Sequence, residues 1–224
     1  VREKMAGIDH FWLHAPFAEL APCAVDPLVR EVTARRYRQA LSAARQLGIR
    51  RLVIHSGYIP LVYFPEWFTE QSVAFWREFL PEVPEDMVLA LENVMDETPQ
   101  LMTDIVRQVD DPRLGLCLDV GHANTCASRT PPMEWIAPMA PYLRHVHLHN
   151  NLGDWDLHSS LGEGSIPMQQ ILAALLEQCA PELMKTMNSA LSTSDYYYDA
   201  LVRVMNRVRY RDWNMRMEGS CGCW

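Results

Sequence analysis

Short apolar runs alternate with longer amphipathic stretches along most of this 224-residue chain. Such alternation predicts strands that are each followed by a helix, and repeated units of this kind form a parallel sheet covered by helices. The predicted fold class is therefore α/β. The strands are expected over residues 9–14, 51–55, 87–92, 114–119, 143–148 and 183–188.

Helix signals separate the predicted strands. Asp26 followed by Pro27 is typical of an N-cap and the first helical position, and Gly48 is typical of a helix end. The apolar residues between them recur at helical spacing, which predicts one long helix over this segment. Further helices are expected to begin at Pro99, after Thr98, and at Pro167, and a last one is expected over residues 195–208.

Two stretches rich in proline and aromatic residues, 58–67 and 129–141, are predicted to be long loops after strands. Loops in these places build the binding sites of barrel enzymes. We see no internal repeat, low-complexity tract or linker that would divide the chain. One domain is expected over residues 1–217, followed by a flexible tail over 218–224, whose Cys-x-Cys is too short to form a closed zinc site.

Charge and cysteine content limit the binding partners and the cellular compartment to be expected. The formal net charge of −8 argues against a surface that binds nucleic acid by neutralising phosphates alone, because such a surface needs clustered Lys and Arg. Six scattered cysteines in a chain of this size indicate reduced thiols and a cytoplasmic protein. The sequence has no apolar run of about 18 residues or more, so no membrane partner is expected.

Most of the predicted strands end in a side chain that can hold a metal ion. His14, His55, Glu92, Asp119 and His147 all occupy this place. Because the carboxyl ends of parallel strands meet at one edge of a sheet, these side chains are expected to converge. A lone histidine after an apolar strand is more often a hydrogen-bonded core residue, but the same placement in five strands favours a metal site.

Two further pairs lie in predicted turns. Asp119 and His122 belong to one Asp-Val-Gly-His segment, and both side chains are within reach of one metal cluster; alternatively, Asp119 caps the following helix and His122 is solvated. Asp156 and His158 are two residues apart, so an extended segment would place both on one face, a spacing suited to a single ion. The alternative for this second pair is a polar loop.

Three histidines alternate with apolar residues in the fifth predicted strand, so all three imidazoles share one face. We interpret His145 as an interior packing or hydrogen-bonding residue and His149 as a loop residue, which leaves His147 nearest the rim. A Gly-Glu-Gly turn follows at residues 162–164, where the backbone could approach a ligand closely because glycine has no Cβ.

The order and spacing of these motifs resemble the xylose isomerase-like TIM barrels, a family that includes sugar isomerases and epimerases and the endonuclease IV type of apurinic-site nuclease. The resemblance implies a (β/α)8 barrel. It also implies that this chain is N-terminally incomplete, because the family's first two β/α units have no counterpart here and six strands cannot close an eight-stranded barrel. The matching segments are 11–17, 51–57, 89–93, 116–122, 145–149 and 156–164.

The resemblance further implies a set of metal ligands. In the sugar branch a subset, here Glu92, Asp119 and His147, holds one ion, whereas in the nuclease branch the set holds three zinc ions. These residue types suit zinc, manganese or magnesium, so one to three divalent ions are the expected cofactors. The ligand set falls on His14, His55, Glu92, Asp119, His122, His147, Asp156 and His158.

Three functions are compatible with these features. The first is a metal-dependent isomerase or epimerase of a small sugar, sugar phosphate or polyol, in which Glu92 is a ligand and the catalytic proton shuttle and His122 contacts the substrate. The second is an endonuclease IV-like zinc phosphodiesterase, the one case with DNA as a partner. The third is a non-catalytic family member, because Asn188 stands where the family has a final Glu and an amide cannot act as a base. A homo-oligomer is compatible with all three.

Overall fold

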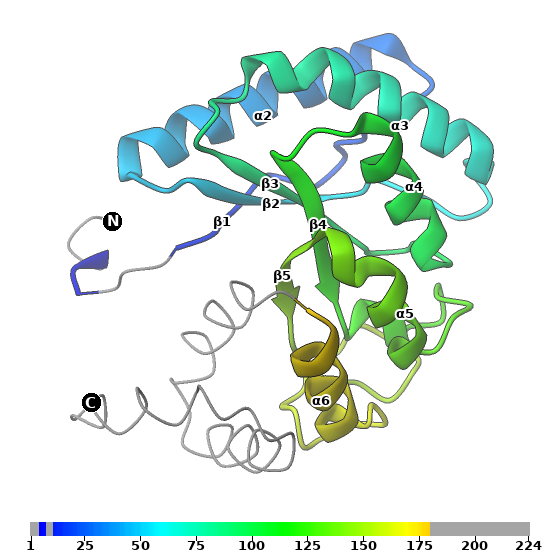
Figure 1. Cartoon of the computed structure of the whole chain (residues 1–224). Helices are drawn as coiled ribbons and strands as arrows, with labels where there is room; N and C mark the ends of the chain where they lie inside the picture. The colour runs from blue at the N-terminus through cyan, green and yellow to red at the C-terminus, as the bar shows by residue number, and fades with distance from the viewer. Residues whose placement is uncertain (1–4, 8–10, 180–224) are drawn as a thin grey trace.

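The strands lie side by side in the order in which they occur along the chain, and all pair in parallel. The computed structural model describes residues 5–7 and 11–179. Within this part the sheet curls and the helices lie along its outer side, as in a portion of a barrel (Figure 1). The strands are β1 (Leu13–His14), β2 (Arg51–His55), β3 (Val88–Glu92), β4 (Leu114–Asp119) and β5 (Leu143–His147). The helices are α2 (Pro27–Leu47), α3 (Pro65–Phe79), α4 (Pro99–Val109), α5 (Pro132–Met139) and α6 (Met168–Gln178), with short 3-10 turns η1 (Leu80–Glu82), η2 (His122–Asn124) and η3 (Ala140–Tyr142).

Parallel pairing brings the carboxyl ends of the strands to one edge of the sheet. His55 at the end of β2 lies opposite Glu92 at the end of β3, and Asp119 at the end of β4 lies opposite His147 at the end of β5. Side chains that are far apart in the sequence therefore meet at this edge, as the strand order of a parallel barrel requires.

An irregularity in the pairing of β4 with β5 decides which face the β5 histidines occupy. The register shifts between Leu116 and Cys117, which advances β5 by one residue. Because successive side chains of a strand point to opposite faces, a shift of one residue exchanges the faces. As a result His147, and not Val146, lies opposite Asp119.

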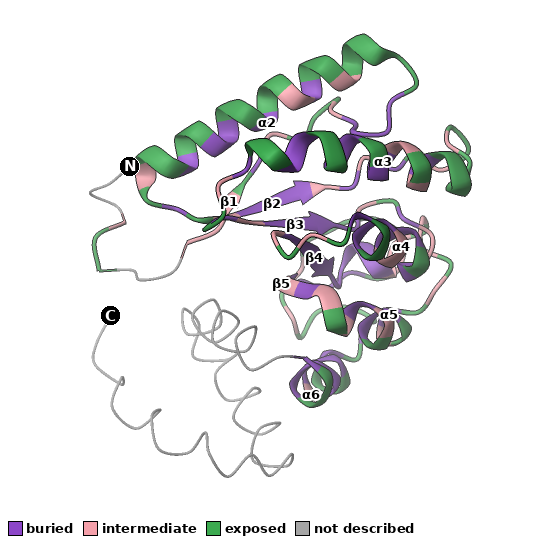
Figure 2. Ribbon diagram, turned by 45° about the horizontal axis from the view of Figure 1, so that its top comes forward, coloured by how far each residue is buried: buried purple, intermediate pink, exposed green. Residues whose placement is uncertain are grey.

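Local signals explain where the longest helix begins and ends. The Asp26 carboxylate accepts a hydrogen bond of 2.8 Å from the Leu28 amide at the start of α2. At the other end Gly48 adopts a left-handed φ of 75°, which allows its amide to bond back to the last turn. The buried residues of α2 form one stripe against the sheet, and the other helices show the same pattern (Figure 2).

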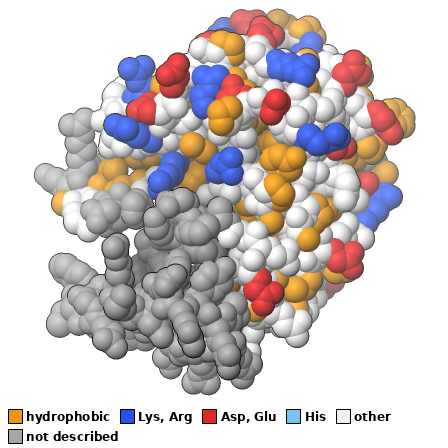
Figure 3. All heavy atoms as spheres, in the orientation of Figure 1, with side chains coloured by type: hydrophobic (Ala, Val, Ile, Leu, Met, Phe, Trp, Pro, Cys, Tyr) orange, Lys and Arg blue, Asp and Glu red, His pale blue; other side chains and the backbone are white. Residues whose placement is uncertain are grey.

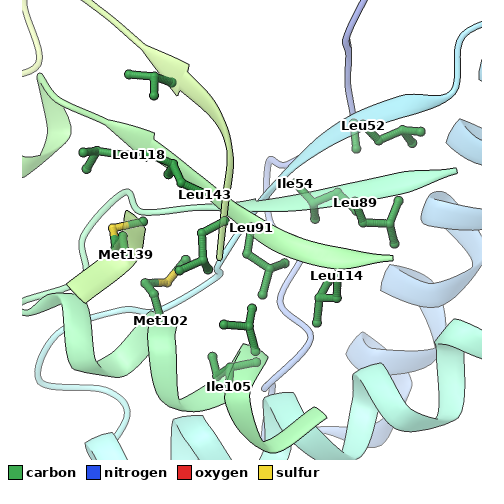
Figure 4. Close-up of a cluster of buried hydrophobic side chains, with 14 of the residues drawn as sticks. Leu52, Ile54, Leu89, Leu91, Met102, Ile105, Leu114, Leu118, Met139 and Leu143 are labelled. Atoms are coloured by element: carbon green, nitrogen blue, oxygen red, sulfur yellow. The ribbon is translucent and has the colours of Figure 1, made fainter. Parts of the chain in front are cut away.

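The core lies between the outer face of the sheet and the helices. Leucine and isoleucine side chains of the strands pack there against Met102 and Ile105 of α4 and Met139 of α5 (Figure 4). All of these groups are almost fully buried, so truncation of any one of them is expected to cost about 2–5 kcal/mol. The inner face carries a smaller cluster of Val53, Ala90 and Cys117, packed with Trp12.

Two segments that the sequence predicts to be long loops contain helical residues. α3 begins at Pro65, inside the stretch 58–67, and α5 fills most of the stretch 129–141. Each helix has a proline in its first turn, where the fixed φ of proline suits a helix and no backbone donor is lost. Trp135 and Ile136 of α5 are fully buried, so their burial stabilises a helix where the proline content predicted a loop.

The remaining elements agree with the prediction at most positions. β2 and β4 have the predicted bounds, and β3 and β5 differ from them by one residue at one end, whereas β1 is reduced to two described residues. Among the described residues no helix is both long and apolar enough to cross a membrane. The predicted strand 183–188 with Asn188, the helix 195–208 and the tail 218–224 lie outside the described residues.

Candidate metal centre

Glu92 lies at the centre of a group of side chains from all five strands. One carboxylate oxygen, Oε1, is 2.7 Å from Nδ1 of His147. The other, Oε2, is 3.0 Å from Nε2 of His14 and 3.5 Å from Nε2 of His55. Glu92 itself is buried, so water stabilises its charge little and the facing histidines are its nearest polar partners. With Asp119, which approaches His147, these residues form what we name the sheet group: His14, His55, Glu92, Asp119 and His147.

Hydrogen bonds to the backbone assign the free nitrogen of two rings. Nδ1 of His14 is 2.9 Å from the carbonyl oxygen of Ala15, and Nδ1 of His122 is 2.8 Å from that of Asn93. Because a carbonyl oxygen only accepts, each Nδ1 carries a proton, so Nε2 is the nitrogen of each ring that is placed to face a metal ion; without an ion, Nε2 of His14 donates to Glu92. Nε2 of His122 is 3.2 Å from Asp156. The assignment favours His122 as a ligand beside Asp156 over a ligand of the sheet group.

Asp119 is held in place by the residue that follows Glu92. The side chain of Asn93 accepts a hydrogen bond of 2.8 Å from the Asp119 amide and donates one of 3.0 Å to the Asp119 carbonyl oxygen. Asp119 in turn accepts from the His122 amide at 2.8 Å through Oδ1, while Oδ2 is 3.5 Å from His147 Nδ1. Asp119 thus bonds to the start of η2 and also faces the sheet group, whereas His122 is buried and not solvated.

A second group lies beside the first and is centred on Asp156. Oδ2 of Asp156 is 3.2 Å from Nε2 of His122 and 3.0 Å from Nε2 of His158. The segment is not extended as predicted, because His158 has a left-handed φ of 48°, and this turn brings its ring back to Asp156. Nε2 of His149 is 3.5 Å from Oδ1 of Asp156. We name His122, His149, Asp156 and His158 the loop group; one ligand atom from each lies within 4.8 Å of the others.

Two members of this neighbourhood were missed in the sequence. His149 was interpreted as a loop residue, and although it follows β5 it lies in the loop group; the shared face of the three alternating histidines was the available signal. Cys117 lies within metal-binding distance of Glu92 and His147. Burial raises the pKa of the Cys117 thiol, which keeps it protonated and makes it a poor ligand.

Other expectations for this region are also decided by the structure. His145 stacks on Trp12 with ring centroids 4.4 Å apart, so it is an interior packing residue as predicted. The second glycine of the Gly-Glu-Gly turn packs closely on protein, because a Cβ on Gly164 would lie 2.1 Å from Oδ1 of Asn150.

The sheet group holds two carboxylates whose charge a cation would balance, and without a metal ion the proton on His147 balances it instead. Burial disfavours the ionised form of Glu92, but hydrogen bonds from His14 and His147 outweigh it and lower the Glu92 pKa to about 2. Burial likewise opposes the charge of His147, yet hydrogen bonds to Asp119 and Glu92 raise the His147 pKa to about 10. Burial lowers the pKa of His55 to about 4, so this ring is neutral at pH 7 and keeps a lone pair. Ionised carboxylates beside imidazoles are a donor set for zinc or manganese.

The curled parallel sheet and its polar edge define a class of protein, the α/β barrels that gather histidines and carboxylates at the carboxyl ends of their strands. The chain belongs to the family of xylose isomerase-like TIM barrels, whose family model matches residues 2–181. The five described strands are thus a part of a TIM barrel, as expected.

Relatives by sequence include proteins of two kinds. An uncharacterized protein of Methanocaldococcus jannaschii is 32% identical over 175 residues, which are 74% of this chain and 59% of that protein. A probable endonuclease 4 of Mycobacterium leprae is 23% identical over 186 residues, which are 78% of this chain and 72% of that protein. The chain therefore spans about three fifths of the first relative.

Two solved structures share the fold. The crystal structure of a D-tagatose 3-epimerase-like protein matches with a TM-score of 0.72 and 25% identity, covering 94% of this chain and 83% of that one. A Thermus thermophilus protein whose crystals were soaked with ZnCl2 matches with a TM-score of 0.66 and 27% identity, covering 90% of this chain and 81% of that one.

Proposed function

We propose that the chain is a divalent-metal-dependent isomerase or epimerase of a small sugar, sugar phosphate or polyol, with Glu92 as a metal ligand and proton shuttle. The observation that carries this proposal is the position of Glu92. Its buried carboxylate ends the central strand of the five, and each of its oxygens faces a histidine nitrogen at about hydrogen-bond distance. The likeness to a D-tagatose 3-epimerase-like protein supports the same class of reaction.

The metal would be held by Glu92, Asp119 and His147, and when bound it supplies a positive charge that polarises a carbonyl or hydroxyl oxygen of the substrate. The side chains of the protein carry out the proton transfer. Glu92 is ionised, because its pKa is lowered to about 2, so it is ready to accept a proton from the carbon next to that carbonyl and to return it. His122 remains a proposed substrate contact, although its free nitrogen faces Asp156.

An aromatic side chain at the edge of the sheet group suits a sugar. Phe17 is about half exposed, stacks on the His55 ring at 4.4 Å between centroids and meets the His14 ring edge-on at 5.4 Å. The C–H face of a sugar packs well on such an apolar ring, while its hydroxyls turn to the polar groups. Phe17 therefore supports a substrate with one apolar face and several oxygens.

Proton transfer at carbon can be measured before the product is identified. The protein, loaded with Mn²⁺, Co²⁺ or Mg²⁺, is incubated with a panel of ketoses and aldoses in D2O, and deuterium uptake beside the carbonyl is followed by NMR. We expect uptake into one sugar class, reduced about 10²–10⁴-fold in Glu92→Gln. Exposed Glu134 at the start of α5 gives a matched control, Glu134→Gln, which should behave as wild type. Absence of exchange across the panel, with metal bound, would contradict the proposal.

A second candidate, an endonuclease IV-like zinc phosphodiesterase, is favoured by one observation. His14 and His55 on one side of Glu92, and the loop group on the other, provide ligands for more ions than a single-metal isomerase needs. Against it, the face shown in Figure 3 intersperses Lys and Arg with Asp and Glu, and the net charge is −8. Chelator-sensitive cleavage of a duplex with one abasic site would establish this function in place of the first.

A further inference from the structure

A group of large apolar side chains is exposed where α2 and α3 begin. Both helices start at the same end of the molecule, on the right in Figures 1 and 2. The side chains come from the turn before α2, from the loop that joins β2 to α3, and from the first turn of α3. Leu61 is 99% exposed and Phe64 is 79% exposed. We name this surface the corner patch: Val25, Ile59, Leu61, Val62, Phe64 and Trp67.

Contacts between the two segments make the corner patch one surface. Nε1 of Trp67 donates a hydrogen bond of 3.4 Å to the carbonyl oxygen of Cys23, two residues before Val25. A Cβ on Gly57 would lie 3.1 Å from Cα of Ala21, so the loop after β2 packs closely against the segment before α2. The apolar side chains of both segments are therefore neighbours at this end of the molecule.

The loop after β2 presents its apolar side chains from an ordered backbone. The amides of Val62 and Tyr63 both donate hydrogen bonds of 3.2 Å to the carbonyl oxygen of Ile59. Leu61, between them, has a left-handed φ of 66°, which L side chains rarely adopt. Within one molecule this exposed leucine contributes no burial in return for its strained backbone. A loop that is ordered in advance suits a docking surface, because little conformational entropy is lost on association.

The size of the corner patch matches what a stable dimer needs. At about 150–200 Å² for a fully exposed residue of this size, the exposed parts of its members amount to roughly 600–700 Å². The largest apolar patch on a typical monomer covers about 300–600 Å². A standard interface buries about 800 Å² on each partner, of which about 55–65% is apolar. The corner patch alone can supply that apolar part.

The charges beside the corner patch suit pairing with a copy of the same surface. Arg30 donates a hydrogen bond of 3.0 Å to the carbonyl oxygen of Val25 and lines the groove between α2 and α3. Glu66 and Glu70 are exposed one turn apart on α3, and neither lines that groove. None of these three charged residues makes an ion pair within the described part of the chain. A two-fold rotation exchanges the two sides of a surface, so Arg30 of each copy would face Glu66 or Glu70 of the other.

We propose that the corner patch joins two copies of this chain in a symmetric dimer, with Leu61 and Phe64 of each copy packed across the two-fold axis. A lipid surface fits the patch less well, because two carboxylates flank it and the net charge is −8. The loop begins directly after His55, so the second copy stands beside the candidate metal centre. The dimer does not depend on the proposed sugar chemistry.

Analytical ultracentrifugation over a range of protein concentrations tests the dimer. We expect wild type to sediment as a dimer and Leu61→Asp to raise its dissociation constant more than about 30-fold, because a charge then lies at the centre of the interface. Asp tolerates a left-handed backbone, so the variant should fold, which circular dichroism checks. The matched control is Leu152→Asp, since Leu152 is also an exposed leucine but lies in the loop after β5. It should dimerise as wild type does.

Charge reversal tests the two-fold arrangement separately. Arg30→Glu should weaken the dimer about 10-fold or more, because like charges then face each other, and the added changes Glu66→Arg and Glu70→Arg should restore most of the affinity. Absence of that rescue would overturn the symmetric pairing. A monomeric wild type, or a Leu61→Asp variant that dimerises normally, would overturn the proposal as a whole. So would a monomer that binds phosphatidylcholine vesicles through Leu61, because the patch would then dock on lipid.

Discussion

Asn93 sets the geometry of two candidate ligands at once. Its side chain makes hydrogen bonds to the amide and to the carbonyl oxygen of Asp119. Its own backbone carbonyl oxygen accepts a hydrogen bond from Nδ1 of His122. The first interaction fixes the Asp119 carboxylate beside His147, and the second leaves Nε2 of His122 free for a metal. Groups that orient ligands in this way often matter nearly as much as the ligands themselves.

Removal of the Asn93 amide should therefore weaken metal binding without removing a ligand. We expect Asn93→Ala to lower the affinity for Zn²⁺ about 10–100-fold, because Asp119 loses its fixed position. Chelator competition measures this, with the exposed α4 residue Gln100→Ala as the control. Wild-type affinity in Asn93→Ala would show that Asp119 is positioned by other contacts.

Asp96, which is not itself a candidate ligand, gives a pH dependence of stability. Its Oδ2 accepts from Ser56 Oγ at 2.7 Å and from the Val94 amide at 3.0 Å, but Oδ1 is buried without a partner. Burial outweighs these hydrogen bonds and raises the Asp96 pKa from 3.8 to about 6. The folded state therefore binds this proton more tightly than the unfolded state, and the contribution of Asp96 to stability falls as pH rises from about 4 to about 6.

Asp96→Asn should remove that contribution. The free energy of unfolding of the variant relative to wild type should increase by about 3 kcal/mol between pH 4 and pH 7, from a shift of about two pKa units. Urea unfolding at several pH values measures it. A constant difference across this range would mean that Asp96 is not the group that titrates.

The helices hold the strand ends in place from outside, and each described strand brings one member of the sheet group. α2 is the longest of them and lies between β1 and β2 in the sequence, so its start and end set the connection between His14 and His55. Its N-terminus depends on one side-chain bond, from the Leu28 amide to Asp26.

Loss of that cap should destabilise the element modestly. Asp26→Ala should lower the free energy of unfolding by about 1 kcal/mol, because one amide of the first turn loses its partner. Denaturant unfolding measures the change, and exposed Asp154→Ala in the 151–158 loop is the control. Equal stabilities of the two variants would show that solvent replaces the cap without cost.

Elements marked by local signals could be predicted from the sequence. β2 and β4 are apolar runs that end at a polar residue, and α2 has a cap at each end, so their bounds follow from neighbouring residues. α5 could not be distinguished from a loop by its prolines, because its helical state depends on burial of Trp135 and Ile136 against the rest of the molecule.

The candidate site could also be predicted from the sequence only in part. Glu92 and Asp119 follow from their place at strand ends, since parallel pairing converges there. The role of His149 depends on the space beside Gly121 and on a turn that His158 makes in a left-handed conformation. Neither is visible in alternating residue types, so the sequence left His149 outside the site.

At the scale of the whole molecule, the candidate metal centre brings together residues from all the described strands. The sheet group takes one residue from each of β1 to β5, and the loop group adds the segment after β5. Any ion bound at Glu92 therefore couples parts of the chain that are separated by more than a hundred residues. The chain spans about three fifths of its first sequence relative, and the activity of the whole protein is proposed on the basis of this shared centre.

Metal content per chain tests the central claim most directly. Wild type, Glu92→Ala and the exposed control Glu134→Ala are purified without chelator and analysed by elemental mass spectrometry. The account predicts that Glu92→Ala loses at least one divalent ion per chain relative to wild type, while Glu134→Ala matches wild type. A folded wild type without metal, or a Glu92→Ala variant with unchanged metal content, would contradict it.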